Sequence, residues 1–242
     1  HFSGHAGDYA AHRPVYPPEL FAALAANCAA HDLAWDCATG NGQAARSLIP
    51  YFRSVIGTDA SAEQIASADD TAKLEYRVAR AEDSGLGDDA VDLVTVAQAL
   101  HWFDIDAFFA EADRVLKADG ILAFWCYQNC VVDNDVDAVV LDIFGEVEDF
   151  WPPERTIVED EYPTIAMPFA DVPTDNFCML ADWQADQLLN YMRTWSAAKR
   201  YTARHGRDPV DLHAARLRGA WGGGTRQVRW PIVLRVGRKR RA

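Results

Sequence analysis

Several features that would assign this chain to a special class of protein are missing from its sequence. No apolar run approaches the roughly 20 residues of a membrane-spanning helix, and no signal-peptide pattern is recognisable. The five cysteines are odd in number and form no C-x-x-C pair, which argues against a disulfide framework or a zinc site. There is no internal repeat and no low-complexity linker. These absences predict a cytoplasmic protein whose cysteines are small buried residues.

Positive charge is also scarce. Lys and Arg total 23 against 36 Asp and Glu, which gives a formal net charge of −13. Such a surface repels the phosphates of nucleic acids and anionic lipids, so we expect neither a nucleic-acid nor a membrane partner. The one basic cluster, residues 235–241, is more typical of a solvated chain end than of a docking surface. The sequence does not indicate an oligomeric state.

What the sequence does contain is an alternation of short apolar runs with helical patterns. Half of the 242 residues are hydrophobic, enough for the core of one large domain. Alternating strands and helices are typical of an α/β fold with a mostly parallel sheet. The predicted strands are residues 33–36, 54–58, 74–78, 91–97 and 121–127. The predicted helices include 18–30, 44–50, one capped by Ser61 and 104–117.

The pattern changes after residue 127. Trp, Pro and acidic residues cluster around 151–154, a helix is predicted over 184–195, and strands are predicted over 176–182 and 227–236. Pro231 favours an edge or bulge position for the last strand. We therefore expect one domain over residues 1–242, in which the variable segment 128–207 covers a substrate.

The turn after the first strand, Asp36-Cys37-Ala38-Thr39-Gly40-Asn41-Gly42-Gln43, carries the strongest chemical signal. Its glycines permit positive φ and a close approach of the backbone to a ligand. The next helix presents free N–H groups, and ligands of open parallel sheets bind at this edge. The sequence of this turn is compatible with two classes of cofactor. Gly40 to Ala45 fit the G-x-G-x-x-A pattern of NAD(P)-dependent oxidoreductases, with Asp59 at about the expected distance.

Asp36 favours S-adenosylmethionine (SAM). A carboxylate at the tip of the strand serves a cationic ligand, and SAM carries an ammonium and a sulfonium, whereas a pyrophosphate gains nothing from it. We expect Asp36 to orient the turn and the aminoacyl end of the cofactor. Asp59, at the tip of the second strand, is expected to accept both ribose hydroxyls.

These motifs resemble the class I SAM-dependent methyltransferases, and in particular the small-molecule branch of type 11 and trans-aconitate methyltransferase-like enzymes. The family's D-x-G-x-G-x-G turn appears as DCATGNG, with Ala38 in place of the first glycine. The resemblance implies a Rossmann-like, mostly parallel seven-stranded sheet with helices on both faces and an antiparallel last strand. It also implies the remaining cofactor contacts, which fall on Ala60, Gln64, Ala81, Glu82, Ala97, Trp102 and, in an N-terminal lid, Tyr9 and Arg13.

The implied reaction transfers the methyl group of SAM to a small-molecule acceptor and leaves S-adenosylhomocysteine. An in-line displacement from a sulfonium needs alignment and exclusion of water more than a catalytic dyad. His101 is the candidate general base, although a packing role beside Trp102 is the favoured alternative. The aromatic residues that offer an acceptor pocket are Trp125, Tyr127, Phe150, Trp151, Tyr162 and Phe169. A non-catalytic member of the family that binds SAM remains an alternative.

Overall fold

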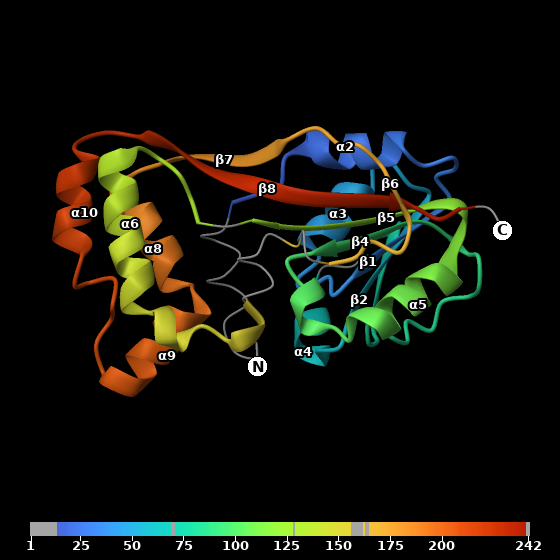
Figure 1. The fold of residues 1–242 in the computed structure, drawn as a ribbon, viewed down its shortest axis with the longest axis horizontal. Coiled ribbons are helices and arrows are strands. Elements are labelled where there is room, and N and C mark those ends of the chain that lie inside the picture. Colours follow the sequence, from blue (N-terminus) through green and yellow to red (C-terminus); the bar gives the residue numbers. More distant parts are fainter. Residues whose placement is uncertain (1–13, 69–70, 128, 156–161, 163–164, 241–242) are drawn as a thin grey trace.

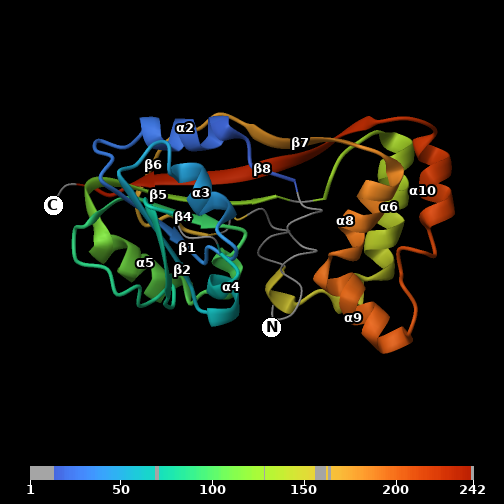
Figure 2. The same cartoon turned by 180° about the vertical axis from the view of Figure 1, so that it is seen from behind.

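The computed structural model describes residues 14–68, 71–127, 129–155, 162 and 165–240. They form a sheet flanked by helices and a separate group of helices beyond one end of it (Figures 1 and 2). We call the first part the core. The second part, the helical lobe, consists of α6 (Asn134–Glu146), α8 (Ala185–Arg193), α9 (Ser196–His205) and α10 (Ala214–Trp221).

The sheet confirms the predicted fold class. Its central path runs β3 (Leu74–Val78), β2 (Ser54–Asp59), β1 (Leu33–Cys37), β4 (Val91–Ala97), β5 (Leu116–Tyr127), all parallel, and then the antiparallel β8 (Arg226–Arg238). The strand β7 (Phe177–Trp183) pairs antiparallel with the first half of β8. These seven strands are joined by the two-residue β6 (Ala170–Asp171), which pairs with the far end of β8.

Helices cover both faces of the sheet. On one face α2 (Pro18–Ala26) and α3 (Gln43–Leu48) contribute the fully buried side chains of Leu20, Phe21 and Leu48. On the other face α5 (Ile105–Val115) buries Phe108 and Val115. The central strand β4 is apolar and buried along almost its whole length, as expected for a parallel strand covered on both sides.

Strands β3 and β4 and the cap residues Ser61 and Asp104 follow the prediction. Most other boundaries shift by one or two residues, and two boundaries shift by more. Helix α2 ends at Ala26 rather than Ala30, where the Asn27 side chain donates to the carbonyl of Ala23 at 2.9 Å. Helix α5 ends at Val115, and β5 already begins at Leu116. The expected break at 118–120 is instead an irregularity inside the strand, because the β4–β5 register shifts there and Asp119 adopts φ 65°.

The helical lobe has its own aromatic centre. Trp195 lies 5.8 Å from Trp151 and 6.1 Å from Tyr191, between ring centroids, and Tyr191 lies 5.4 Å from Trp230 of β8. The lobe extends past the predicted segment 128–207, because α10 packs on α6 and belongs to the same group. The long strands β7 and β8 connect it to the core (Figure 1).

The position of Pro231 agrees only in part with the predicted edge or bulge. It stands one residue outside the β5–β8 ladder, which ends at the pair of Tyr127 with Ile232, but inside the β7–β8 ladder, where it pairs with Cys178. The described part of the basic cluster, residues 235–240, is mostly held within the fold rather than being a solvated chain end. Arg235 and Arg238 are part of β8, and the ammonium group of Lys239 donates to the carbonyl of Leu116 at 2.8 Å.

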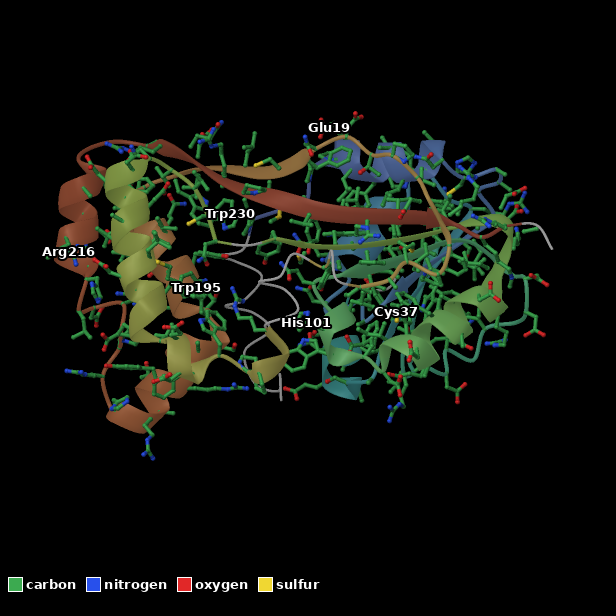
Figure 3. The ribbon with its side chains drawn as sticks, viewed as in Figure 1. Glu19, Cys37, His101, Trp195, Arg216 and Trp230 are labelled. Atoms are coloured by element: carbon green, nitrogen blue, oxygen red, sulfur yellow. The ribbon has the colours of Figure 1, made fainter. Side chains whose placement is uncertain are left out.

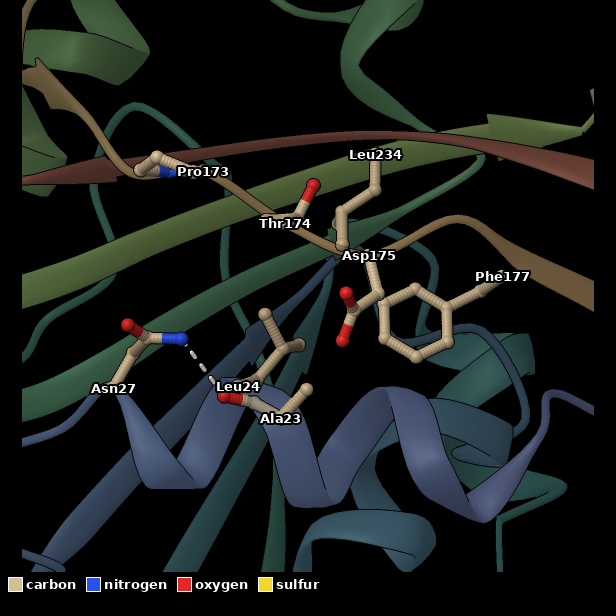
Figure 4. Close-up of a pocket in the computed structure, with 8 residues that line it drawn as sticks. All are labelled: Ala23, Leu24, Asn27, Pro173, Thr174, Asp175, Phe177 and Leu234. Atoms are coloured by element: carbon tan, nitrogen blue, oxygen red, sulfur yellow. Dashed lines mark hydrogen bonds between the residues drawn. The ribbon is translucent and has the colours of Figure 1, made fainter.

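None of the described helices is long and apolar enough to cross a membrane. Within the same residues no group of three His, Cys, Asp or Glu side chains could hold a metal ion. Figure 4 shows a pocket of about 190 Å³ between α2 and residues 173–177. None of its lining residues belongs to the turn 36–43.

Candidate functional site

The turn between β1 and α3 is built from left-handed backbone. Ala38, Gly40 and Gly42 have φ values of 54°, 56° and 83°. A β-carbon at Gly42 would lie 1.8 Å from the hydroxyl of Tyr76, so this position requires glycine for space as well as for conformation. Ala38 is not the mild replacement that a single added methyl group suggests, because its conformation favours glycine.

The buried carboxylate of Asp36 stabilises this turn through hydrogen bonds. Its carboxylate is 1% exposed and accepts hydrogen bonds from the hydroxyls of Thr39 at 2.6 Å and Thr95 at 2.7 Å. Burial raises the pKa of Asp36 to about 6, against the lowering effect of the two threonine hydroxyls. A carboxyl group perturbed in this way at a ligand-binding edge is typical of a functional site. The geometry supports the orienting role predicted for Asp36, and Thr39 and Thr95 are partners that the sequence did not reveal.

Asp59 ends β2 beside the same turn. One carboxylate oxygen accepts the N–H of Gly40 at 3.0 Å and the other accepts the N–H of Ser61 at 2.9 Å. Ionised carboxylates offer about four acceptor positions, so two positions remain for a pair of hydroxyls. Gln64 lies near the glycine turn, since its Oε1 would be 4.0 Å from a β-carbon on Gly40. Ala60 is exposed between them.

The remaining predicted cofactor contacts lie at or after the ends of β3 and β4. Ala81 is buried, and the carboxylate of Glu82 accepts the N–H of Asp104 at 3.1 Å while it pairs with Arg80 at 3.2 Å. Glu82 therefore has a structural function at the start of α5 whether or not it meets a ligand. Ala97 ends β4 and is half-buried.

Gln98, which the sequence did not single out, follows Ala97 with φ 55°. Its side chain donates to the carbonyl of Tyr127 at 2.9 Å, and this bond ties the ends of β4 and β5 together.

His101 and Trp102 stand on the short 3-10 helix η1 (Leu100–Trp102) that follows β4. Trp102 is 42% exposed, whereas the neighbouring Phe103 packs on Phe108 in the core at 5.0 Å. Burial lowers the pKa of His101 to about 4, with a smaller contribution from the positive charge of Arg155. Arg155 comes from the 3-10 helix η3 (Pro153–Arg155), which follows α6 of the helical lobe and contacts η1. The chain that leaves α6 therefore reaches the core at this point.

Half of the predicted acceptor-pocket aromatics are buried core residues. Trp125 and Tyr162 are fully buried, and Trp125 packs edge-on against Tyr16 at 5.5 Å. Phe150, Trp151 and Phe169 are half-buried, and Tyr127 is buried. Tyr9 and Arg13 lie outside the described residues. Four of the cysteines, Cys28, Cys37, Cys126 and Cys130, are buried, as predicted, while Cys178 is partly exposed.

The residues present fit a bound SAM. Left-handed glycines bring the backbone up to the edge, the carboxylate of Asp59 keeps acceptor positions for the ribose, and the buried charge of Asp36 lies under the turn for a cationic end. In addition, Val78 ends β3 opposite Asp59 in the strand register and is 57% exposed, which provides apolar surface beside the carboxylate.

Comparison with known proteins identifies the family of this chain. Residues 35–124 match the methyltransferase domain of type 11. A Dictyostelium discoideum protein named as a methyltransferase is 35% identical over 189 residues, which are 76% of this chain and 72% of that protein. CRG1 of Saccharomyces cerevisiae, named as a SAM-dependent methyltransferase, is 33% identical over 100 residues, or 38% of this chain and 34% of CRG1.

The solved structures agree. A protein of Anaeromyxobacter dehalogenans described as a type II methyltransferase is 39% identical and superimposes with a TM-score of 0.89 over 95% of this chain and 99% of that one. These relatives decide between the two cofactors that the glycine turn allowed, and the dinucleotide-dependent oxidoreductase is set aside. The chain belongs to the type 11 methyltransferases and is a SAM-dependent methyltransferase of Rossmann-like fold.

Proposed function

We propose that this enzyme methylates a small-molecule acceptor by in-line displacement at the carboxyl edge of its sheet. The observation that carries the proposal is the position of the helical lobe. Figures 1 and 2 show β5 leading from the core toward α6 of the lobe, and β1 and β4 run parallel to β5. The turn of Gly40 and Gly42 follows β1 and the helix η1 follows β4, so both lie at the end of the core that faces this lobe. The contact of η1 with η3 joins the two parts there. Segment 128–207 supplies most of the lobe and is the part that covers the acceptor.

The cofactor is held by the residues at the ends of β1 and β2. Asp59 accepts the ribose hydroxyls, Asp36 orients the turn toward the aminoacyl end, and the backbone of Ala38, Gly40 and Gly42 closes on the ligand. Further contacts come from residues at the same edge, namely Ala60, Gln64, Ala81, Glu82, Ala97 and Trp102, and from Tyr9 and Arg13.

The bound sulfonium supplies an already activated methyl group. The chain therefore has to align the acceptor with it and exclude water. His101 is the ionisable side chain of η1 and can contact the acceptor there. The exposed ring of Trp102 beside it offers a surface for an apolar part of the acceptor.

A small acceptor fits this edge better than a macromolecule. The helical lobe stands in front of the edge, so a folded partner would have to displace it. The net charge of −13 disfavours a nucleic acid, and the basic residues at the end of β8 are engaged within the core.

The test is transfer of label from methyl-labelled SAM in three parallel screens, to small carboxylic, phenolic and amine acceptors, to RNA and DNA, and to protein extracts. We expect label only in the small-molecule screen and its loss in Asp59→Ala. Labelling of nucleic acid or protein alone would contradict the proposal. With an acceptor in hand, a chiral methyl group should arrive inverted.

A further inference from the structure

One row of residues crosses the sheet beside the turn between β1 and α3. In the strand register Asp36 of β1 is paired with Thr95 of β4 and with Gly57 of β2. Gly57 is paired in turn with Tyr76 of β3. Paired residues point to the same face of a sheet, and Tyr76 packs against the hydrophobic cluster of α2 and α3 on this face. Figure 3 shows the next residue of β1, Cys37, inside the core, where it belongs to the cluster on the opposite face.

The glycine in this row leaves space for the ring of its neighbour. A β-carbon on Gly57 would lie 2.9 Å from Cδ1 and 3.0 Å from Cε1 of Tyr76, which is closer than side chains normally approach. The backbone of Gly57 is not left-handed, so glycine is needed here for space and not for conformation. Glycine inside a strand often marks such a close approach. The ring of Tyr76 therefore lies over β2 where a side chain would otherwise stand.

The same ring reaches the glycine turn. A β-carbon on Gly42 would lie 2.6 Å from Cζ and 2.9 Å from Cε1 of Tyr76. Tyr76 therefore occupies the space of two missing side chains, one on β2 and one at the start of α3. Thr39 borders the first of these spaces, since its Oγ1 would lie 3.0 Å from the β-carbon on Gly57. This is the hydroxyl that donates to Asp36.

Ala38 explains why the turn needs support from the sheet. It adopts φ 54°, and left-handed backbone is unfavourable for a residue with a β-carbon. Such a conformation persists only where the surroundings hold it in place. Toward the sheet these surroundings include the hydrogen bond of Thr39 and the ring of Tyr76. The hydroxyl oxygen at the tip of this ring is buried, so the ring acts on the turn and not on the ligand.

We propose that Tyr76 is a positioning residue for the cofactor, whose ring fills the spaces beside Gly42 and Gly57 and keeps the turn in the shape that binds SAM. A turn that is held in its bound shape loses less freedom when the ligand arrives, and this raises affinity. The assignment rests on the proposed function only in placing the cofactor at this turn, and it does not depend on the acceptor.

The first test is calorimetric titration of S-adenosylhomocysteine into the whole chain. Tyr76→Phe keeps the ring and should bind within about threefold of the wild type, whereas Tyr76→Leu removes the ring and should lose about tenfold. Phe52→Leu is the matched control, because Phe52 is buried in the same cluster but packs on His31 just before β1, with ring centroids 5.3 Å apart. It should lower stability and leave affinity unchanged. Equal losses in Tyr76→Phe and Tyr76→Leu would overturn the proposal.

Gly57 provides a second test, which a general loss of packing would not reproduce. Gly57→Ala should lower the affinity for S-adenosylhomocysteine about tenfold, because the new methyl group displaces the ring of Tyr76. In the Tyr76→Leu background the same substitution should cost less than about threefold, since leucine has no ring carbon over β2. Losses that simply multiply in the double variant would contradict a role through this contact.

Hydrogen exchange of the ligand-free chain reports on the turn itself. The amide of Gly42 donates to the carbonyl of Thr39 at 2.9 Å. In Tyr76→Leu its protection should fall about tenfold relative to the amide of Ala90, which donates to the carbonyl of Val115 at 2.9 Å. An equal fall at both amides would indicate a loss of stability throughout the core and would overturn the proposal.

These measurements separate this proposal from the proposed function. If Tyr76→Leu keeps its affinity while Asp59→Asn loses it, the cofactor is at the turn and Tyr76 does not position it. If both variants keep their affinity, the cofactor binds elsewhere and the proposed cofactor site is refuted. Should Tyr76→Leu fail to fold, the affinity of Gly57→Ala and the exchange of its Gly42 amide decide the question.

Discussion

The core and the helical lobe are stabilised in different ways. In the core, hydrogen bonds of buried polar groups support the site, as those of two threonines to Asp36 do. In the lobe, aromatic rings pack around Trp195, and the ion pair of Arg218 with Asp186 lies on the surface, with side chains 53% and 69% exposed. The cofactor end therefore depends on backbone geometry and buried hydrogen bonds, whereas the acceptor end depends on side-chain packing, which tolerates exchange of residues of similar volume.

The largest effect on stability is expected in the lobe. Trp195→Ala removes a 4% exposed indole from contacts with Trp151, Phe144 and Tyr191, and should lower the free energy of unfolding by about 4 kcal/mol. S-adenosylhomocysteine affinity should change less than about threefold, because these contacts lie outside the cofactor edge. Denaturant unfolding measures the loss of stability, and calorimetric titration measures the affinity for S-adenosylhomocysteine. If the free energy of cofactor binding fell by more than the free energy of unfolding, packing in the lobe would also determine cofactor binding, against the contrast drawn between lobe and core.

The core glycine should behave in the opposite manner. Gly42→Ala combines a clash with Tyr76 and a left-handed backbone, so we expect a cost of about 3 kcal/mol together with loss of S-adenosylhomocysteine binding. Gly145→Ala is the matched control in α6, where no atom lies within 4 Å of the new β-carbon. It should stabilise the protein by up to about 1 kcal/mol. Equal effects at both glycines would contradict the account.

The charge of Asp36 predicts a pH dependence confined to the core. Its folded pKa of about 6 lies above the unfolded value of about 3.9. The folded state therefore holds the proton more tightly, and stability is lost as the pH rises from about 4 through 6. Relative to Asp36→Asn, the wild type should lose up to about 3 kcal/mol over this range, at 1.4 kcal/mol per pKa unit. A stability difference that stays constant with pH would exclude this origin.

The smallest contrast concerns two ion pairs. Glu111 is 7% exposed and accepts from Ser84 and from Arg114 at 2.7 Å, so Glu111→Ala should cost about 2 kcal/mol by leaving buried donors without partners. Asp186→Ala in the lobe should cost less than about 1 kcal/mol. Urea midpoints compare the two directly. A larger cost at Asp186 would show that the lobe also depends on its charges.

The fold was largely predictable from the sequence because buried parallel strands form short apolar runs. Strands 74–78 and 91–97 match the prediction to the residue. The start of β5 was predicted too late because the chain passes from helix to strand without a break and places its irregularity at Asp119. The lobe was harder to define, since α10 joins α6 through contacts that no local pattern encodes.

The site was predictable only where neighbours in the chain build it. Asp36, Asp59 and the glycines occupy one turn and one strand end, and the structure places them together. The contacts of Thr95 with Asp36 and of Tyr162 with His101 span 59 and 61 residues. Only the folded sheet and the return of the chain from the lobe create them, so no spacing in the sequence could have indicated them.

The most direct test of the account is calorimetric titration of S-adenosylhomocysteine into the wild type, Asp59→Asn and the surface control Asp186→Asn. An amide has one oxygen and cannot accept from Gly40, Ser61 and two ribose hydroxyls together. We predict binding of one ligand per chain in the wild type and the control, and at least about a tenfold loss in Asp59→Asn, beyond any change in its unfolding. Unchanged affinity in Asp59→Asn would contradict the central role of this carboxylate.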